Sequence, residues 1–357
     1  MRYIGSKARV LDFIQDTVTE TYGSLEGAVA ADLFAGTACV AERFKAQGAR
    51  LITNDYLWFS YALQVARVKL NRAPECPISY EEALERLNAL PGAEGFFYRE
   101  YTLEGGAASG FRRNYFSAEN AKKIDAICLT LQQWRAEDQI DGDMYYLLAA
   151  ALVDAITKVS NTSGTYGAFL KGDDQRKYKP LWLLPVSFLD NHQENQAYCA
   201  DIRDLIGQVE GDLLYLDPPY NGRQYPPYYH ILETAVLYDA PAIYGVTGRR
   251  PYQEKLSPFC RKDLALPAMV DLVERARFPH IYISYSTDGI MDYQGLCQAL
   301  AACGQVECFF RPYRRYKSNS GGESGQKSVK EIIIYVKKRG AEAAGEVRRG
   351  PGRAGHL

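Results

Sequence analysis

The stretch Gly27-Ala28-Val29-Ala30-Ala31-Asp32-Leu33-Phe34-Ala35-Gly36-Thr37 begins with an apolar run that predicts a buried β-strand, which Gly36 ends in a tight turn. Residues 37–47 then predict a helix, residues 50–55 a second strand, and residues 56–70 another helix. This order is typical of an open parallel sheet, whose ligand lies at the carboxyl ends of the strands. The sequence therefore predicts an α/β fold.

The rest of the chain divides by composition into further parts. Residues 75–195 are polar, acidic and mostly helical in pattern, and we interpret them as an insertion. The α/β pattern resumes near residue 196, so residues 1–74 and 196–338 are expected to form one discontinuous domain. Residues 339–357 are rich in Gly, Ala and Arg and predict a disordered basic tail. The other expected elements are helices at 8–22 (with Ser6 as N-cap), 80–90, 118–134 and 144–157, and strands at 212–217, 280–286, 306–310 and 331–336.

The net charge of −1, from 42 basic and 43 acidic residues, excludes a nucleic-acid binder that relies on bulk positive charge. The charge is nevertheless segregated along the chain. Residues 75–199 hold 12 basic and 18 acidic side chains, a net of −6, whereas residues 300–357 hold 12 and 5, a net of +7. Nucleic acid therefore stays open as a partner that is contacted by a few placed cations.

Cysteine and hydropathy patterns predict the compartment. The eight cysteines form no CxxC pair and the chain has only four histidines, so we expect no metal site. No apolar run approaches the roughly 20 residues of a membrane span, and no signal-peptide pattern follows Met1. We expect a cytoplasmic protein with reduced thiols and no membrane partner.

The turn after the first predicted strand indicates the ligand class. Dinucleotide-binding proteins carry GxGxxG here, which brings the backbone against a pyrophosphate. This turn lacks that pattern, and Asp32 would repel a phosphate. A cationic or zwitterionic ligand such as S-adenosylmethionine, with its ammonium and sulfonium groups, fits better. Asp55 follows at 55 − 32 = 23 residues, a spacing typical of a ribose-binding carboxylate, and it is also placed to cap the next helix.

The motif Asp217-Pro218-Pro219-Tyr220 directly follows a predicted strand and carries the chemistry. Methyl transfer to an exocyclic amine requires acceptors for both N–H groups, so that the nitrogen lone pair is drawn out of the ring. Asp217 and the Pro218 carbonyl can supply these acceptors, and the locked φ of proline fixes the direction of that carbonyl. Tyr220 offers an aromatic face on which an extruded base can stack.

Together these residues resemble the adenine-specific DNA methyltransferases of the Dam-related D12 class, which methylate N6 with S-adenosylmethionine. The resemblance spans nearly the whole chain outside the insertion and the tail. Residues 221–229 are instead similar to methylases of type IIS restriction systems, which argues against the GATC specificity of Dam. The matching segments are Tyr3-Ile4-Gly5-Ser6-Lys7, Asp32-Leu33-Phe34-Ala35-Gly36, Asn54-Asp55, Asp217-Pro218-Pro219-Tyr220, Arg223-Gln224-Tyr225, residues 229–234, Ser284-Tyr285-Ser286 and Arg315-Tyr316-Lys317.

The resemblance implies a Rossmann-like S-adenosylmethionine-dependent methyltransferase sheet with a mostly helical inserted target-recognition subdomain. It also implies double-stranded DNA as substrate, a flipped-out target adenine, and a possible cognate restriction endonuclease. Asp204 competes with Asp201 for contact with the cofactor's adenine. The implied cofactor-binding residues are Tyr3, Ile4, Gly5, Ser6 and Lys7 at the methionine end, Asp32, Phe34 and Gly36 in the pocket, Asp55 at the ribose and Asp201 at the adenine.

Several polar segments are candidates for DNA contact. Arg223, Arg314, Arg315 and Lys317 are predicted to position the phosphate backbone. Residues 161–167 form a polar, glycine-containing loop that could read a groove. His230, a little beyond the motif, is interpreted as a packing or hydrogen-bonding residue rather than a catalytic one.

Three alternatives remain open at the level of sequence. The same scaffold could methylate another sp2-attached nitrogen, such as cytosine N4, an RNA adenine or a protein amide. A non-catalytic DNA-binding protein that kept the fold is the second. A nicotinamide dehydrogenase is the third, and the missing GxGxxG argues against it.

Overall fold

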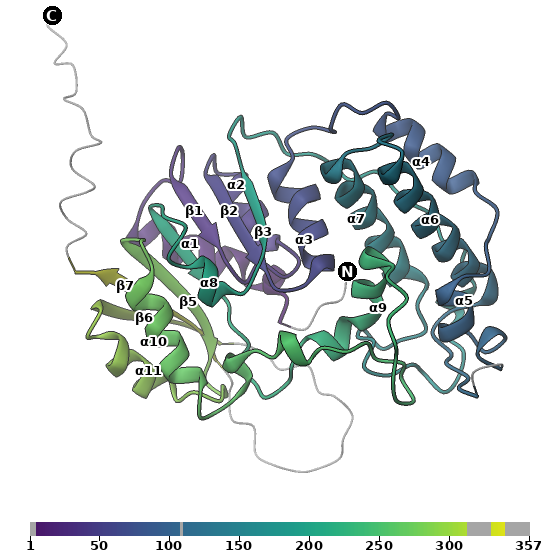
Figure 1. Cartoon of the computed structure of the whole chain (residues 1–357). Helices are drawn as coiled ribbons and strands as arrows, with labels where there is room; N and C mark the ends of the chain where they lie inside the picture. The colour runs from purple at the N-terminus through teal and green to yellow at the C-terminus, as the bar shows by residue number, and fades with distance from the viewer. Residues whose placement is uncertain (1–4, 108–109, 313–329, 340–357) are drawn as a thin grey trace, which may run out of the picture.

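A computed structural model describes residues 5–107, 110–312 and 330–339. Within these ranges one seven-stranded sheet has the order β3-β2-β1-β4-β5-β7-β6 (Figure 1). The first five strands in this order, which are β3, β2, β1, β4 and β5, run parallel to one another. Strand β7 is antiparallel to both of its neighbours, β5 and β6. The strand order reverses between β1 and β4, as in Rossmann-like folds, which confirms the predicted fold class. The strands are β1 (Val29–Asp32), β2 (Arg50–Asp55), β3 (Gln196–Cys199), β4 (Leu213–Leu216), β5 (His280–Ser286), β6 (Gly304–Pro312) and β7 (Lys330–Lys338).

Helices cover both faces of the sheet and form a separate helical body beside it (Figure 1). The α-helices are α1 (Leu11–Thr21), α2 (Cys39–Lys45), α3 (Trp58–Gln64), α4 (Tyr80–Ala89), α5 (Phe96–Tyr101), α6 (Ala118–Ala136), α7 (Gly142–Val159), α8 (Ile202–Leu205), α9 (Pro226–Leu237), α10 (Ala265–Arg275) and α11 (Tyr293–Leu300). A 3-10 turn, η1 (Lys7–Arg9), precedes α1, and a π-helical segment, η2 (Val65–Lys69), follows α3. The helices predicted at 8–22 and 56–70 are thus each divided in two.

Alternation along the strands sorts the core into two layers. On β7, Ile332 and Ile334 pack on the face covered by α8, α10 and α11. Ile333 and Tyr335 pack on the opposite face, covered by α1 and α2. Successive strand side chains point to opposite faces, so this continuous apolar strand is buried on both sides.

The helical body has a core of its own, formed by α4 to α7 together with α3 and α9. Leu148 on α7 and Leu232 on α9 are both fully buried there. The helices expected as an insertion therefore share a core with two helices of the sheet units. The domain boundaries at 75 and 195 stay a prediction, and residues 340–357 of the predicted tail lie outside the described residues.

Two findings on the described residues concern membrane spans and metal sites. None of the helices is both long and apolar enough to cross a membrane. Within the same residues, His, Cys, Asp and Glu side chains form no group of three or more that could hold a metal ion.

Candidate active site

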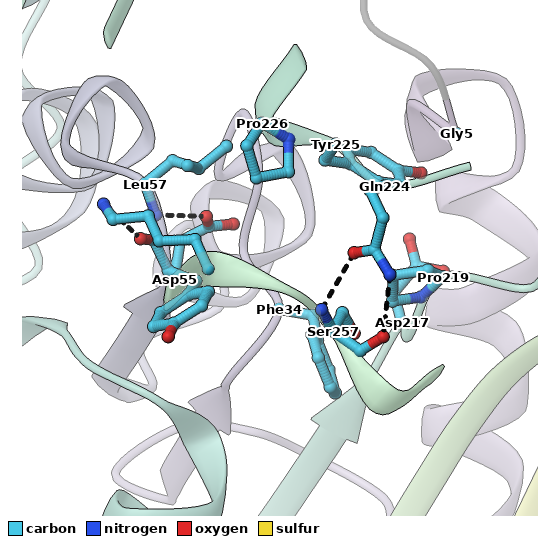
Figure 2. Close-up of a pocket in the computed structure, with 12 residues that line it drawn as sticks. Gly5, Phe34, Asp55, Leu57, Asp217, Pro219, Gln224, Tyr225, Pro226 and Ser257 are labelled. Atoms are coloured by element: carbon cyan, nitrogen blue, oxygen red, sulfur yellow. Dashed lines mark hydrogen bonds between the residues drawn. The ribbon is translucent and has the colours of Figure 1, made fainter. Parts of the chain in front are cut away.

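The carboxyl ends of β1, β2 and β4 meet at one edge of the sheet and bring three carboxylates there. Asp32 is the last residue of β1, Asp55 is the last of β2, and Asp217 directly follows β4. A cavity that is open to solvent lies beside Asp55 and Asp217, with about 570 Å³ of empty space when the solvent at its mouth is included (Figure 2). It is lined by Gly5, Phe34, Asp55, Tyr56, Leu57, Asp217, Pro219, Gln224, Tyr225, Pro226, Lys255 and Ser257.

Asp55 connects the turn after β1 with the start of α3 through two hydrogen bonds. Its Oδ2 accepts from the Gly36 N–H at 2.9 Å, and its Oδ1 accepts from the Leu57 N–H at 3.0 Å. Burial raises the pKa of Asp55 to about 6, although these backbone donors oppose the shift. Gly36 has a φ of +52°, the left-handed region that glycine adopts without strain. The N-cap residue of α3 is Leu57, which has no side-chain cap hydrogen bond, so the capping role that the sequence allowed for Asp55 is not found. Asp55 instead accepts from the Leu57 N–H just ahead of the helix and lines the cavity.

Asp32 is not among the residues that line the cavity, and it is 1 % exposed. Among the described residues its Oδ1 has no hydrogen-bond partner. Burial and the nearby charges of Asp217 and Asp55 raise the pKa of Asp32 well above its usual range. A buried acceptor without a donor, in a cluster of acids, fits a ligand that brings positive charge. The residues therefore fit S-adenosylmethionine, the cofactor that the sequence resemblance implies, and do not fit a pyrophosphate.

Asp217 is paired with a lysine from the other end of the sequence. Lys7 Nζ lies 3.1 Å from Asp217 Oδ1, 3.6 Å from Glu331 Oε2 and 5.5 Å from the ring centre of Tyr220. Although burial opposes a charge, the carboxylates of Asp217 and Glu331 raise the pKa of Lys7 above its usual value. Burial raises the pKa of Asp217 to about 6, with Lys7 acting in the opposite direction.

The other residues of the motif surround Asp217 in different ways. Pro219 lines the cavity, and Pro218 is buried. The Tyr220 ring meets the ring of Tyr285 edge-on, with 6.4 Å between ring centres. The Tyr220 carbonyl also accepts from the Ile290 N–H at 2.9 Å, which fixes the backbone beyond the motif.

Part of the cavity wall comes from residues 255–257, which lie far from the motif in sequence. Gln224 donates from Nε2 to the Ser257 carbonyl at 3.0 Å and accepts from the Ser257 N–H at 2.8 Å (Figure 2). Lys255 donates to the Tyr56 carbonyl at 3.0 Å and pairs with Glu233 at 2.8 Å. Gln224 follows the motif closely, but no local pattern marks residues 255–257 as part of a site.

Gly5 lines the cavity at a position that leaves little room for a side chain. Its φ is +75°, and a Cβ at this position would lie 3.0 Å from Tyr225 Oη. Ser6 next to it caps η1, as predicted. Tyr3 and Ile4 lie outside the described residues.

The remaining predicted residues are placed elsewhere. Asp201 caps α8 and pairs with Arg203, outside the residues that line the cavity. Although burial opposes it, hydrogen bonding from Arg203 lowers the pKa of Asp201. Arg223 is exposed beside the motif. Arg314, Arg315 and Lys317 lie outside the described residues.

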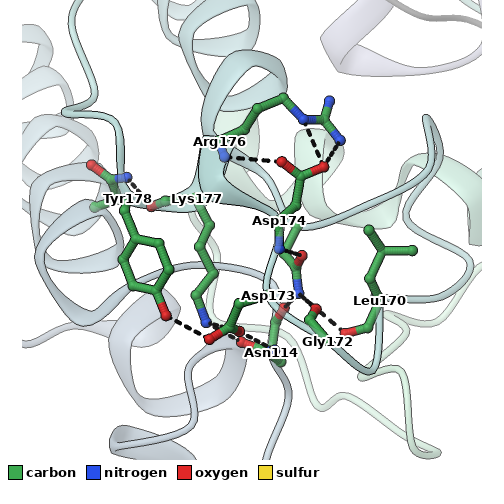
Figure 3. A network of polar contacts seen from close by, with 10 residues as sticks. Asn114, Leu170, Gly172, Asp173, Asp174, Arg176, Lys177 and Tyr178 are labelled. Atoms are coloured by element: carbon green, nitrogen blue, oxygen red, sulfur yellow. Dashed lines mark hydrogen bonds and ion pairs between the residues drawn. The ribbon is translucent and has the colours of Figure 1, made fainter.

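The polar loop at 161–167 is held firmly against the helical body. The Asn161 side chain is fully buried and forms hydrogen bonds with Leu170, Gly172 and Asp174, which belong to the polar network in Figure 3. The Tyr166 N–H donates to the Tyr228 carbonyl on α9 at 2.8 Å. His230 Nε2 lies 3.0 Å from the Tyr166 carbonyl oxygen. Burial lowers the pKa of His230 to about 3, which agrees with the predicted non-catalytic role. The loop is therefore fixed to the helix that starts at the cavity.

Comparisons with known proteins agree with this geometry. The family model described as D12 class N6 adenine-specific DNA methyltransferase matches residues 3–288. The chain is 40 % identical to Type II methyltransferase M.FokI of Planomicrobium okeanokoites over 344 residues, 95 % of this chain and 53 % of that protein. It is 38 % identical to Type II methyltransferase M.NlaIII of Neisseria lactamica over 322 residues, 89 % of this chain and 93 % of that protein. The chain thus spans about half of the first relative and nearly all of the second.

Proposed function

Because this chain belongs to the D12 class of N6 adenine-specific DNA methyltransferases, we propose that it methylates adenine N6 at a specific site in duplex DNA as part of a restriction-modification system. The observation that carries the proposal is the motif that begins at Asp217, whose carboxylate and Pro219 line the cavity at the sheet edge. A cognate endonuclease is proposed as a functional partner, because the relatives above are Type II methyltransferases.

Some residues of the site bind the cofactor, and others orient the target adenine. S-adenosylmethionine, when bound, supplies an electrophilic methyl group. Asp55 accepts hydrogen bonds from its ribose, and Phe34 packs in the same pocket. The target adenine enters flipped out of the duplex and stacks on Tyr220. Asp217 and the Pro218 carbonyl accept its two N–H groups, so that the nitrogen lone pair points at the methyl carbon.

The electron and proton balance of the step is simple. The N6 lone pair forms the new N–C bond as the S–C bond breaks, the electrons of that bond stay on sulfur, which becomes a neutral thioether, and N6 then releases one proton to water. Holding the two reactants in this geometry supplies much of the rate enhancement. The cations Arg223, Arg314, Arg315 and Lys317 are proposed to contact the DNA backbone, and Asp201 is proposed to face the adenine of the cofactor.

The decisive experiment is the D217A variant assayed on duplex DNA, with nucleoside digestion and mass spectrometry to identify the product. Wild type should form N6-methyladenine, and D217A should form none while its affinity for S-adenosylmethionine largely persists. D271N, an exposed carboxylate on α10, is the matched control and should retain activity. Formation of N4-methylcytosine would show that the acceptor is cytosine N4 and not adenine N6. Methylation of RNA alone would show that the substrate is RNA and not DNA. Near-normal turnover by D217A would refute the mechanism.

A non-catalytic DNA-binding role is the alternative from another class. Calorimetric titration with S-adenosylmethionine discriminates the two, because a protein that had lost catalysis would have no need to retain the cofactor site. Saturable binding to wild type, together with methyl transfer, excludes the alternative.

A further inference from the structure

The ion cluster at the active site includes an acid that the family motifs do not contain. Glu331 lies on β7, beyond residue 288 where the match to the family model ends. In the sheet it is opposite Ser286 of β5 and Arg311 of β6. Antiparallel pairing of β7 with β5 thus carries a carboxylate from the end of the chain to the edge where Asp217 lies.

Lys7 lies closer to Asp217 than to Glu331. Lys7 Nζ is 3.1 Å from Asp217 and 3.6 Å from Glu331, and the Lys7 and Glu331 side chains are 4 % and 11 % exposed. Glu331 Oε2 accepts no hydrogen bond among the described residues. A buried carboxylate oxygen without a donor is costly, so the position of Glu331 calls for an explanation. Lys7 is the cation within reach to supply one.

The chemistry of the proposed reaction sets conflicting demands on Asp217. It must be ionised to accept an N–H from the target amine, and a nearby ammonium favours that state. The same ammonium competes with the amine if it occupies the carboxylate fully. A second carboxylate within 3.6 Å of Lys7 Nζ shares the hydrogen-bonding capacity of the ammonium, so that Asp217 does not take all of it.

We propose that Glu331 is a positioning residue, which shares the Lys7 ammonium with Asp217 so that Asp217 keeps an oxygen for the target amine. This rests on the proposed function. Glu331 acts through Lys7 and does not itself contact the adenine. Its two contributions, the charge and the reach of its side chain, are separable by substitution.

The test compares E331Q and E331D with E307Q, an exposed carboxylate on the neighbouring strand β6. Single-turnover methylation is measured against pH, so that the chemical step is observed directly. In E331Q we expect the rate to fall by about 10-fold to 100-fold, because Lys7 moves onto Asp217. The acid limb of the pH–rate profile, where the rate falls as Asp217 is protonated, should shift down by roughly 0.5–1 pH unit. The reason is that the negative charge of Glu331, which raises the pKa of Asp217, is gone.

The other two variants separate charge from packing. E331D keeps the charge but shortens the side chain, so its acid limb should stay near that of wild type while its rate falls. E307Q should match wild type in both. A purely structural role for Glu331 would lower the rate of E331Q and leave the acid limb in place, and that result would overturn the proposal, as would a normal E331Q enzyme.

A second readout does not depend on catalysis. Acylation of Lys7 by an amine reagent, followed by peptide mass spectrometry, reports the free-amine fraction. E331Q should react severalfold faster than wild type and E307Q at the wild-type rate, because loss of one paired carboxylate lowers the pKa of Lys7. If wild type methylates no DNA, the proposed function fails, while unchanged Lys7 acylation in E331Q refutes the role of Glu331 separately.

Discussion

Replacement of Asn161 by alanine should release the polar loop beside α9. The Asn161 Nδ2 donates to the carbonyls of Asn114, Leu170 and Gly172 at 2.9, 3.1 and 3.1 Å. Its Oδ1 accepts from the Asp174 N–H at 2.9 Å (Figure 3). N161A therefore removes one side chain that closes four backbone contacts, without changing any group of the cavity.

The cost follows from those contacts. A buried polar group left without a partner costs about 1–3 kcal/mol. Gly172 is exposed and Leu170 half-buried, so water can replace part of the loss, and we expect about 3 kcal/mol in total. With an unfolding entropy of roughly 2.1 cal/mol/K per residue, the 357 residues give about 0.75 kcal/mol/K. The expected fall in Tm is then about 4 °C.

Scanning calorimetry and hydrogen exchange measure this effect. Exchange should quicken in residues 162–173 and stay unchanged in β4 and β5. N221A is the matched control, because it removes one exposed contact, the Arg223 N–H to Asn221 Oδ1 at 3.0 Å, and should change Tm by less than about 1 °C. The KM for DNA should rise in N161A while the Kd for the cofactor stays constant. A Tm within 1 °C of wild type would refute the assigned role of the network.

Three further results are expected. The methylation rate should rise about tenfold from pH 5 to pH 7, because Asp217 has a pKa of about 6 and its ionised fraction goes from about 9 % to about 91 %; a flat profile over that range, measured with DNA binding saturated, would contradict it. G5A should raise the cofactor Kd, by isothermal titration, because Gly5 has a positive φ and an added Cβ would lie 3.0 Å from Tyr225 Oη; an unchanged Kd would contradict this reasoning. Treatment with the thiol oxidant diamide should cross-link Cys297 to Cys308 ahead of other pairs, because their sulfurs lie 3.1 Å apart, and non-reducing peptide mapping would show a different pair if this is wrong.

The sequence predicted well those elements that are buried on both sides. The bounds of β2 (Arg50–Asp55) and β5 (His280–Ser286) agree with the predictions, because buried parallel strands require continuous apolar or β-branched residues. The strand ends at Asp32, Asp55 and Asp217 were predictable for the same reason. Since parallel strands share an edge, three residues far apart in sequence could be placed at one site.

Other elements left little signal. β3 (Gln196–Cys199) is an edge strand with a polar, partly exposed sequence, so it lacks the buried pattern. α9 (Pro226–Leu237) is buried over most of its surface, which removes the amphipathic period. Lys255 and Glu331 reach the site through a loop and an antiparallel strand, and their contribution depends on tertiary contacts that no local pattern encodes.

The electrostatics of the site explain why its first turn differs from that of a dinucleotide-binding protein. Asp32, Asp55 and Asp217 converge at one edge, and Glu331 adds a fourth carboxylate there, with Lys7 shared between two of them. Burial makes each additional negative charge costly, which is why the pKa values of the three aspartates are raised. A ligand that brings an ammonium and a sulfonium relieves this excess, whereas a pyrophosphate would add to it. We therefore expect the cofactor, with its sulfonium, to bind more tightly than its thioether product, and isothermal titration of both molecules tests this; equal Kd values would contradict the electrostatic argument.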